Sequence, residues 1–474
     1  MRTAPVGLAL VALLAGAACA PAAPAAPVAP GAPAIVITGA TLWDGSGRPP
    51  LAHATLVVQS GHVVSVSDAL PSALPPGARL VDATGRWIIP GLVDGHVHFS
   101  QSGSLYTRPD ALDLRAVRSY ADELARTRAG IDELLRSYLA LGITAVVDVG
   151  GPLWTFDVRD RARRPDALAP HVAVAGPLLA ANPLPPLDLG DPPVLAVTSP
   201  EAARAAVRTL AARSPDLVKI LFGDESPAAV DAFFPTAEAI LAEAHAHGLR
   251  VAVHANTLAV ARRIVTAGAD VLVHDITDVP VDPAFVKLLR ERGVILMPTL
   301  IVASGYQRAF AGTLVVTPRA ARFASPDVIA SWRAWAEVAA TVTAPLREHA
   351  RAELAAPSPV PAENLRRLHA GGVTIAAGSD AGNIGTLHGL ALFDELAAMH
   401  AAGLSNDAVL LAATRDAARV FARTPDFGTL VPGQRADFLI LGGDPLADLS
   451  ALEQVEWVAK DGVLRRPDAI LPPR

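Results

Sequence analysis

The sequence predicts an α/β fold in which a (β/α)8 barrel of the TIM type carries a small β-sandwich domain built from both ends of the chain. The first observation behind this prediction is that eight short apolar runs alternate with helical patterns along the body of the chain. Such strands indicate a parallel sheet that is buried on both faces, and eight units favour a closed barrel over an open sheet. The second observation is that strand-like segments stand at both termini. A length of 474 residues leaves room for this second, smaller domain.

The barrel is expected over residues 91–425. Its apolar, strand-like runs are residues 91–96, 144–149, 171–175, 217–222, 250–254, 271–274, 294–298 and 373–377. Helical patterns stand between several of them, as at residues 201–213, 236–247, 258–267 and 283–292. The connection 301–361 is too long for a simple loop. It holds a helical pattern over residues 326–354, which we expect to cover the mouth of the barrel.

Short segments of alternating polarity at each end of the chain predict the second domain. They cover residues 34–41, 54–67, 436–442 and 455–463. We therefore expect residues 34–90 and 426–474 to form one discontinuous β-sandwich domain beside the barrel.

The first residues of the chain predict export. Arg2 precedes an apolar run, and small residues follow as far as Ala20, which is typical of a secretory signal peptide over residues 1–20. Residues 21–33 are almost all alanine and proline and predict an extended linker. The expected location is the periplasm, or a membrane that faces an extracytoplasmic space.

Cys19, the only cysteine of the chain, has two interpretations. Residues 14–19 resemble a lipobox, in which Cys19 is lipidated, although Gly16 stands where leucine is usual. Ordinary cleavage at an Ala-x-Ala site is the alternative, and both interpretations stay open. A lipid on Cys19 predicts that the protein meets a membrane only through this anchor.

The composition predicts a globular protein whose partner is a small molecule. Apolar residues make up 51% of the chain and charged residues 18%. The formal net charge is −6, and no basic run exists to neutralise phosphates, so a nucleic-acid partner is not expected. The composition leaves a homo-oligomer open.

Two His-x-His pairs occur in the chain, and they differ in their predicted geometry. His96 and His98 end the first predicted strand, where residues two apart share a face and both imidazoles point the same way. His245 and His247 lie in a helical pattern, where residues two apart point to nearly opposite sides. The first pair therefore predicts two ligands of one metal ion, at the strand end where barrel enzymes place their chemistry.

Further metal-binding side chains follow other predicted strands. His254 ends the fifth apolar run, His274 ends the sixth, and Asp380 follows the eighth. Because the ends of the barrel strands meet at one face, we expect these side chains to converge with the first histidine pair.

Lys219 lies inside the fourth apolar run, where an unpaired ammonium costs several kcal/mol to bury. One interpretation is a salt bridge to Asp224 or Glu225, or a stem that extends the amine to solvent. The other is that the amine adds CO2 and becomes a carbamate anion that bridges two divalent ions. A carbamate keeps the net charge of a site with two dications low, whereas an ammonium increases it further.

Several segments resemble one known family over nearly the whole chain after the linker. Residues 88–98 read IIPGLVDGHVH and residues 428–437 read GTLVPGQRAD, which resemble the first-strand motif of the amidohydrolase superfamily and its return into the satellite sheet. VKI at 218–220, HA at 254–255 and GSDAG at 378–382 are most similar to the branch of imidazolonepropionase-related and Xaa-Pro dipeptidase-like hydrolases.

This resemblance implies that Lys219 is carboxylated and bridges the metals, and that Asp380 is the proton-transfer residue. The chain departs from the dipeptidase pattern after Lys219, where it reads Phe222-Gly223-Asp224 in place of a glycine pair. The departure bears on the substrate more than on the metal chemistry.

The ligand set predicts a metal-dependent hydrolase that cleaves an amide-like C–N bond of a dipeptide, an N-acyl amino acid or a related compound. A metal-activated hydroxide attacks the carbonyl, and Asp380 is the general acid and base. Imidazole and carboxylate ligands favour two Zn2+ ions, with manganese or iron as alternatives. The expected ligands are His96, His98, Lys219, His254, His274 and Asp380.

Two other functions stay open. The first is a mononuclear cyclic amidohydrolase or deaminase-like enzyme that uses His96, His98, His254 and Asp380 with an unmodified Lys219. The second is a tethered binding protein that has kept the barrel and lost catalysis.

Three further side chains are weaker candidates for substrate binding. His388 follows Asp380 closely, with a helix-capping histidine as the alternative. Tyr306 and Arg308 follow the seventh strand and suit a substrate carboxylate, with exposed loop residues as the alternative. Asp148 ends the second strand, where it is expected to orient a neighbour.

Overall fold

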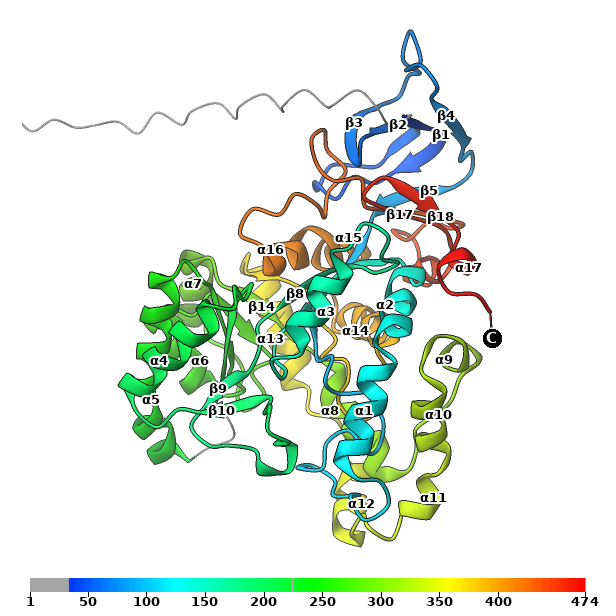
Figure 1. Ribbon diagram of the computed structural model, residues 1–474. Coiled ribbons are helices and arrows are strands. Elements are labelled where there is room, and N and C mark those ends of the chain that lie inside the picture. The colour runs from blue at the N-terminus through cyan, green and yellow to red at the C-terminus, as the bar shows by residue number, and fades with distance from the viewer. Residues whose placement is uncertain (1–33, 223–225, 474) are drawn as a thin grey trace, which may run out of the picture.

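The computed structural model describes residues 34–222 and 226–473 of the chain. The predicted signal peptide, the linker and the proposed lipidation site Cys19 lie outside these residues. So do Asp224 and Glu225, the acids considered as partners of Lys219. In the described part, a small sheet stands at one end of a larger α/β body (Figure 1).

Both ends of the chain build the small sheet. Its strand order is β18-β17-β16-β5-β1-β2-β3, with β4 beside β1. The strands are β1 (Ile35–Leu42), β2 (Leu51–Gln59), β3 (His62–Ser67), β4 (Arg79–Asp82), β5 (Trp87–Pro90), β16 (Phe438–Leu441), β17 (Val455–Lys460) and β18 (Val463–Arg465). β16 runs antiparallel to β5, and side chains from both ends, such as Ile37, Ile88 and Phe438, share one apolar core. The predicted origin of the satellite β structure from both termini is therefore confirmed.

Eight parallel strands form the centre of the body, and each contains part of one predicted apolar run. They are β6 (Leu92–Val97), β7 (Ile143–Asp148), β8 (His171–Val174), β11 (Val218–Leu221), β12 (Val251–His254), β13 (Val271–Val273), β14 (Ile295–Met297) and β15 (Thr374–Ile375). Small and branched side chains, including Val93, Ala145, Val147, Ala252 and Val273, fill the space that the strands enclose.

These strands belong to two hydrogen-bonded sheets, and backbone hydrogen bonds outside the two sheets connect them on either side. β6-β7-β8 form one sheet, and β11 to β15 belong to the other. The Asp216 N–H donates to the Val174 carbonyl at 2.9 Å, and the Gly95 N–H donates to the Ala377 carbonyl at 3.0 Å. The order of the strands around the centre therefore follows the chain, as predicted for the barrel.

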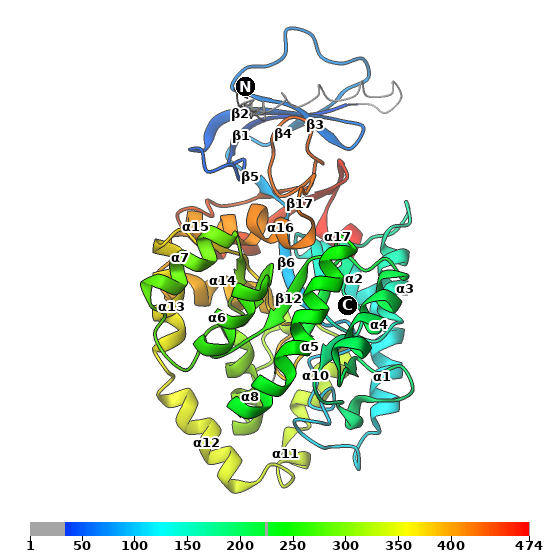
Figure 2. The same cartoon turned by 90° about the vertical axis from the view of Figure 1, so that its left-hand side faces the viewer.

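Helices cover the outside of the strands, and α4, α5, α6 and α7 pack side by side in chain order (Figure 2). The helices that follow the first seven strands are α1 (Tyr120–Ala129), α2 (Ile131–Ala140), α3 (Thr155–Ala162), α4 (Pro200–Ala211), α5 (Pro227–Ala246), α6 (Leu258–Ala267), α7 (Pro283–Arg292) and α8 (Ile301–Ala311). The later ones are α13 (Val360–Ala370), α14 (Leu390–Ala401), α15 (Asn406–Leu411), α16 (Ala417–Phe421) and α17 (Pro467–Ile470).

Local signals start and stop these helices. The Asp282 side chain accepts from the Phe285 N–H at the start of α7, and Gly293 ends that helix in the left-handed region with φ 64°. α5 differs from the prediction, because it begins at Pro227 and continues through Pro235. Buried Val230 and Phe233 stabilise the part of α5 before the proline, where the helical pattern alone gives no signal.

The structure differs from the sequence prediction in two connections. The expected helix over residues 326–354 is divided into α10 (Pro326–Arg333), α11 (Trp335–Val338) and α12 (Ala344–Ala355), preceded by α9 (Pro318–Phe323). Two short strands, β9 (Leu178–Ala180) and β10 (Val194–Ala196), stand between β8 and β11 and extend the second sheet.

In the described part of the chain, no helix has the length and apolar character needed to cross a membrane.

Candidate active site

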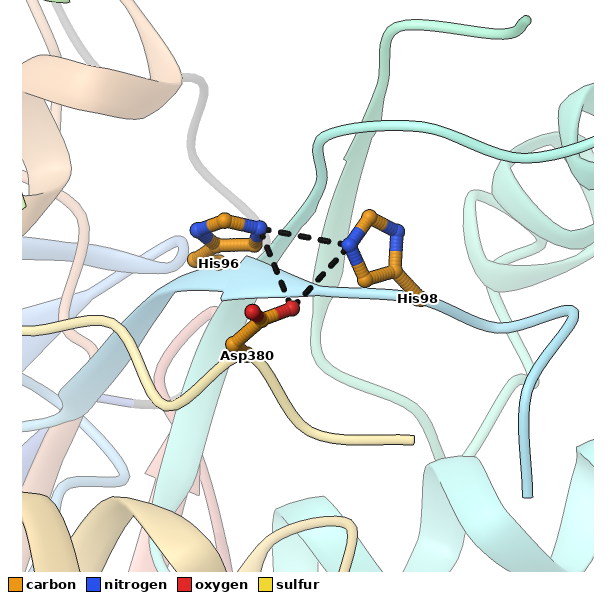
Figure 3. A group of neighbouring side chains, drawn as sticks. All are labelled: His96, His98 and Asp380. Atoms are coloured by element: carbon orange, nitrogen blue, oxygen red, sulfur yellow. Dashed lines mark hydrogen bonds and ion pairs between the residues drawn. The ribbon is translucent and has the colours of Figure 1, made fainter. Parts of the chain in front are cut away.

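His96, His98 and Asp380 meet at one end of the barrel strands, where their side chains point toward one another (Figure 3). The Nε2 atoms of His96 and His98 are 3.3 Å apart. The Asp380 Oδ1 atom lies 3.3 Å from His96 Nε2 and 3.1 Å from His98 Nε2. Three donor atoms from two distant segments thus converge within the reach of a single metal ion.

The orientation of His98 is fixed by the chain that follows β7. The His98 Nδ1–H donates to the Gly150 carbonyl at 2.6 Å, which in the neutral ring leaves the Nε2 lone pair for a metal ion shared with Asp380. Asp148 binds the backbone next to both partners of this contact. Its carboxylate accepts from the Gly150 N–H at 2.9 Å and from the N–H of Phe99, the residue after His98, at 3.2 Å. Asp148 therefore positions the backbone around His98.

His254, His274 and Lys219 lie beside this group. The ring centroids of His254 and His274 are 4.2 Å apart, and those of His96 and His274 are 5.3 Å apart. The Lys219 Nζ atom is buried and has no hydrogen-bond partner among the described residues. The six predicted ligands are thus brought together, and all of them line one cavity of about 450 Å³.

Unusual backbone conformations support this arrangement. His274 and Asp380 have φ angles of 73° and 52°, in the left-handed region that residues with side chains rarely adopt. Asp380 is held there by its N–H, which donates to the His96 carbonyl at 2.8 Å. Strained residues of this kind cluster at functional sites when the surrounding structure fixes them.

Burial determines the charge of the site. It lowers the pKa of His96 and of His254 well below the ordinary value, and it lowers that of His274 to about 3. These imidazoles are therefore uncharged at neutral pH, which is the form that binds metals. Burial also lowers the pKa of Lys219 to about 7, although nearby Asp380 acts in the opposite direction.

The predicted substrate residues lie in different places. Tyr306 lines the cavity, whereas Arg308 and His388 do not occur among the described residues that line it. Arg308 stands two residues beyond Tyr306 on α8, so it points to nearly the opposite side of that helix. Its contact with a substrate stays a prediction that this arrangement does not support.

His388 is buried and hydrogen-bonded through both ring nitrogens. Its Nε2–H donates to the Gln101 carbonyl at 2.7 Å, so Nδ1 accepts the Tyr138 hydroxyl at 2.7 Å. Burial lowers the pKa of His388 to about 4. The ring has no nitrogen left for a substrate in this arrangement, and its predicted substrate contact is likewise unsupported.

Two polar residues of the cavity, Arg108 and Asn383, were not among the sequence candidates. Arg108 donates from Nε and Nη2 to Asp110 at 2.8 and 2.6 Å, and from Nη1 to the Asn383 Oδ1 atom at 2.6 Å. The loop that carries Arg108 has no periodic pattern, so no sequence signal indicates a role for this residue. The short distance from Asp380 to Asn383 along the chain is the one signal that was overlooked.

Apolar side chains form the other wall of the cavity. They come mainly from the inserted strands β9 and β10, the segment between them, the end of β11 and the start of α8. They include Leu178, Leu184, Leu187, Val194, Leu221, Leu300 and Val302. A polar end with metal-binding groups thus faces a wall suited to an aliphatic or aromatic part of a ligand.

Comparison with known proteins gives relatives over much of the chain. An imidazolonepropionase of Mesorhizobium japonicum is 30% identical over 177 residues, which cover 32% of this chain and 42% of that protein. An imidazolonepropionase of Cupriavidus taiwanensis is 28% identical over 297 residues, which cover 53% of this chain and 64% of that protein. The chain thus spans less than two thirds of the length of these relatives.

Solved structures share the fold. A Xaa-Pro dipeptidase with bound methionine matches with a TM-score of 0.68 at 23% identity, covering 91% of this chain and 100% of that one. Molinate hydrolase matches with a TM-score of 0.69 at 21% identity, covering 93% of this chain and 96% of that one. The model of the amidohydrolase family matches residues 87–464, which include the whole barrel and part of the small sheet. The chain therefore belongs to the amidohydrolase family.

Proposed function

We propose that the protein is a metal-dependent hydrolase that cleaves an amide-like C–N bond, with Asp380 as general acid and base. The observation that carries the proposal is that six metal-competent side chains, which lie in or directly after five barrel strands, line one cavity. Known relatives include imidazolonepropionases, and structural relatives include a Xaa-Pro dipeptidase and a phenylurea hydrolase. A dipeptidase and a phenylurea hydrolase thus stand among the proteins that share this fold.

The residues fit divalent ions. His96, His98 and Asp380 are buried and offer one ligand atom each within 4.8 Å of one another. His254 and His274 would hold a second ion. Lys219 would connect the two as a carbamate, and its buried Nζ lacks any partner among the described residues. Zn2+ suits this donor set best.

Lys219 has the properties that formation of a carbamate requires. A free amine adds CO2 to give a carbamate and one released proton. A pKa of about 7 leaves much of the Lys219 amine uncharged at neutral pH. A carbamate also gives the buried end of this side chain two oxygen ligands in place of an ammonium without a counter-ion.

The bound ions would supply a hydroxide at neutral pH and polarise the substrate carbonyl. The chain then has to move one proton, and Asp380 is placed for it. Its Oδ1 atom is close to His96 and His98, while its Oδ2 atom lies 3.9 Å from His274 Nδ1. Asp380 would take the proton of the attacking water and deliver it to the leaving nitrogen.

The cavity favours a substrate with a carboxylate and an apolar group. The Arg108 guanidinium has five N–H donors, and it binds Asp110 and Asn383 with three of them and lies beside the Tyr306 hydroxyl. Those donors suit a carboxylate, and the leucine-rich wall suits an aliphatic acyl group. N-acyl amino acids and dipeptides with apolar residues meet both conditions.

A panel of N-acyl amino acids, dipeptides and lactams tests the proposal with zinc-loaded protein and with the Asp380→Asn variant. We expect release of amine from at least one carboxylate-bearing class, and a loss of rate of about 1000-fold or more in the variant. Equal and metal-independent rates for both proteins would contradict the proposal. Binding of these compounds without turnover would instead favour the tethered binding protein.

A mononuclear enzyme is the second candidate, because the compact group within reach of one ion consists of His96, His98 and Asp380. This site would act on a cyclic amide or amidine and leave Lys219 unmodified. Metal analysis separates the two candidates. One tightly bound equivalent, together with full activity of a Lys219→Ala variant, favours the mononuclear enzyme.

We further propose that residues 1–20 direct export and that residues 21–33 tether the folded body to a membrane through a lipid on Cys19. The mass of the mature protein and its partition into detergent test this proposal. A Cys19→Ala variant should appear in the soluble fraction. A wild-type N-terminus that begins after residue 20 without added lipid would contradict the anchor and support ordinary cleavage.

A further inference from the structure

Asn383 connects Arg108 and Tyr306, the proposed carboxylate-binding groups, to Asp380. Its Oδ1 atom accepts from Arg108 Nη1 at 2.6 Å and from the Tyr306 hydroxyl at 2.7 Å. Its Nδ2 donates to Asp380 Oδ1 at 2.8 Å and to the Asp380 carbonyl at 3.2 Å. The Asn383 amide thus contacts Arg108 and Tyr306 on one side and Asp380 on the other. Asn383 is buried, with 3% of its surface exposed.

The orientation of this amide follows from its partners. The Arg108 guanidinium has only donors, so the atom of Asn383 that faces it must be the oxygen. The amide nitrogen is then directed to Asp380, which accepts it as a carboxylate. A flipped amide would place N–H against N–H on one side and oxygen against oxygen on the other.

The bond to Asp380 distinguishes its two oxygens. Asn383 donates to Oδ1, the same atom that lies nearest to His96 and His98. This donor holds Oδ1 toward the histidines and leaves Oδ2 as the oxygen that carries the proton. The role of Asn383 is therefore to keep one carboxylate in the orientation that proton transfer needs.

We propose that Asn383 is a positioning residue that couples occupancy of the Arg108 and Tyr306 subsite to the orientation of Asp380. A carboxylate bound there takes up donors of Arg108 and Tyr306, the same groups that bind Asn383 Oδ1. When the carboxylate competes for these donors, their hydrogen bonds to the Asn383 oxygen weaken. The Asn383 amide can then shift, and its hydrogen bond to Asp380 shifts with it. The reaction that this coupling serves is the proposed hydrolysis, but the coupling itself can be measured without turnover.

Three variants separate the parts of this network. Arg108→Met removes the cation and keeps most of the length of the side chain. Asn383→Leu keeps the size of the side chain and removes both contacts, whereas Asn383→Asp keeps acceptors for Arg108 and loses the N–H to Asp380. Asn406→Leu is the matched control, because the Asn406 amide donates to the Leu446 carbonyl outside the cavity.

Hexanoate is the probe, with hexanamide as its uncharged counterpart, and protein loaded with Co2+ supplies a visible spectrum that reports on the ligands of the metal. We expect hexanoate to bind the wild type, to shift the cobalt spectrum, and to bind Arg108→Met about tenfold or more weakly. In Asn383→Leu and Asn383→Asp, calorimetry should still detect binding, while the spectral shift disappears. Hexanamide should shift no spectrum, and Asn406→Leu should behave as the wild type.

Two results would overturn the coupling. One is an equal spectral shift in Asn383→Leu and the wild type, which would mean that the anion reaches the metal directly. The other is unchanged hexanoate affinity in Arg108→Met, which would remove the subsite. If Asn383→Leu does not fold, as judged by its melting transition, Asn383→Asp decides the same question.

Steady-state kinetics adds a second readout once a substrate is known. Arg108→Met should mainly raise KM for carboxylate substrates, and Asn383→Leu should mainly lower kcat, by about tenfold or more. A merely structural Asn383 would change both parameters together with stability, and that result counts against the coupling. If no compound is hydrolysed, the proposed function fails while the cobalt and calorimetric results still decide the role of Asn383.

Discussion

The Asp94 carboxylate accepts two hydrogen bonds from Ser379, one from its N–H at 2.9 Å and one from its hydroxyl at 2.6 Å. These residues come from opposite ends of the barrel sequence. Asp94 stands two positions before His96, and Ser379 immediately precedes Asp380. Asp94 also accepts the His96 N–H at 3.3 Å, so one buried carboxylate joins the backbone of His96 to that of the residue before Asp380. We expect the spacing of His96, His98 and Asp380 to depend on this contact.

The variant Ser379→Ala should loosen this contact and weaken metal binding. It leaves the buried Asp94 Oδ2 atom without its hydroxyl donor, which costs about 1–3 kcal/mol of unfolding free energy. We expect zinc affinity to fall by about 10- to 100-fold, as for other residues that orient metal ligands. Competition with a chromophoric chelator measures the affinity, and urea unfolding measures the stability.

Ser137→Ala is the control for this variant, because the Ser137 hydroxyl donates to the Phe323 carbonyl away from the site. It should lose stability and keep its zinc affinity. Unchanged zinc affinity in Ser379→Ala would show that the spacing of the ligands does not depend on the contact with Asp94.

The variant Lys219→Met should lose metal and gain stability. A methionine fills the same space without an amine to desolvate, so the metal-free protein should be more stable than the metal-free wild type by about 1–3 kcal/mol. Without the carbamate, the second ion should not bind, and hydrolysis should fall by about 100-fold or more. Elemental analysis gives the metal content, and the intact mass of the wild type shows the added carboxylate. Two full metal equivalents in Lys219→Met would refute the bridging role.

The convergence of the candidate ligands could be predicted from the sequence because strand geometry is local. His96 and His98 share a face through the period of a strand, and His254 and His274 end apolar runs whose strand ends meet at one face of the barrel. Arg108 could not be predicted, since its loop has no period and its partners Asp110 and Asn383 come together only in three dimensions. The same holds for α5, whose start before Pro235 depends on tertiary packing.

The variant Glu395→Gln should remove a pH-dependent loss of stability. Burial raises the pKa of Glu395 from 4.5 to about 8, although the backbone N–H groups of Leu300 and Ile301 act in the opposite direction. Because the folded pKa is the higher one, the stability that the neutral side chain contributes is fully present below pH 4.5. It is lost as the pH rises through about 8, and the loss is on the order of a few kcal/mol.

Urea unfolding at pH 5 and pH 9 tests this expectation. Glu395→Gln should equal the wild type at pH 5 and exceed it at pH 9. The exposed acid in Glu337→Gln is the control, and this variant should follow the wild type at both values. A constant difference between Glu395→Gln and the wild type across this range would contradict burial of an ionisable Glu395.

Binding of zinc should move a proton within the His96 ring. His98 Nδ1–H is fixed by the Gly150 carbonyl, so His98 Nε2 has a lone pair. His96 Nε2 lies 3.3 Å from it, and two lone pairs at that distance repel each other. We therefore expect the neutral His96 ring of the metal-free protein to carry its proton on Nε2, and its buried Nδ1 has no partner among the described residues. A metal at Nε2 displaces this proton to Nδ1, which makes His96 the residue whose tautomer reports occupancy.

Nitrogen-15 spectra of the histidine rings can follow this change. In chelator-treated protein we expect His96 as the Nε2–H tautomer and His98 as the Nδ1–H tautomer, and after addition of zinc we expect Nδ1–H in both. His98 serves as the internal control, because its Gly150 contact holds the same tautomer in both states. A His96→Ala variant assigns the signals, and the melting temperature shows that the fold persists without metal. An Nδ1–H tautomer of His96 before zinc is added would mean that the two imidazoles separate in the metal-free protein, so that the metal itself draws His96 and His98 together.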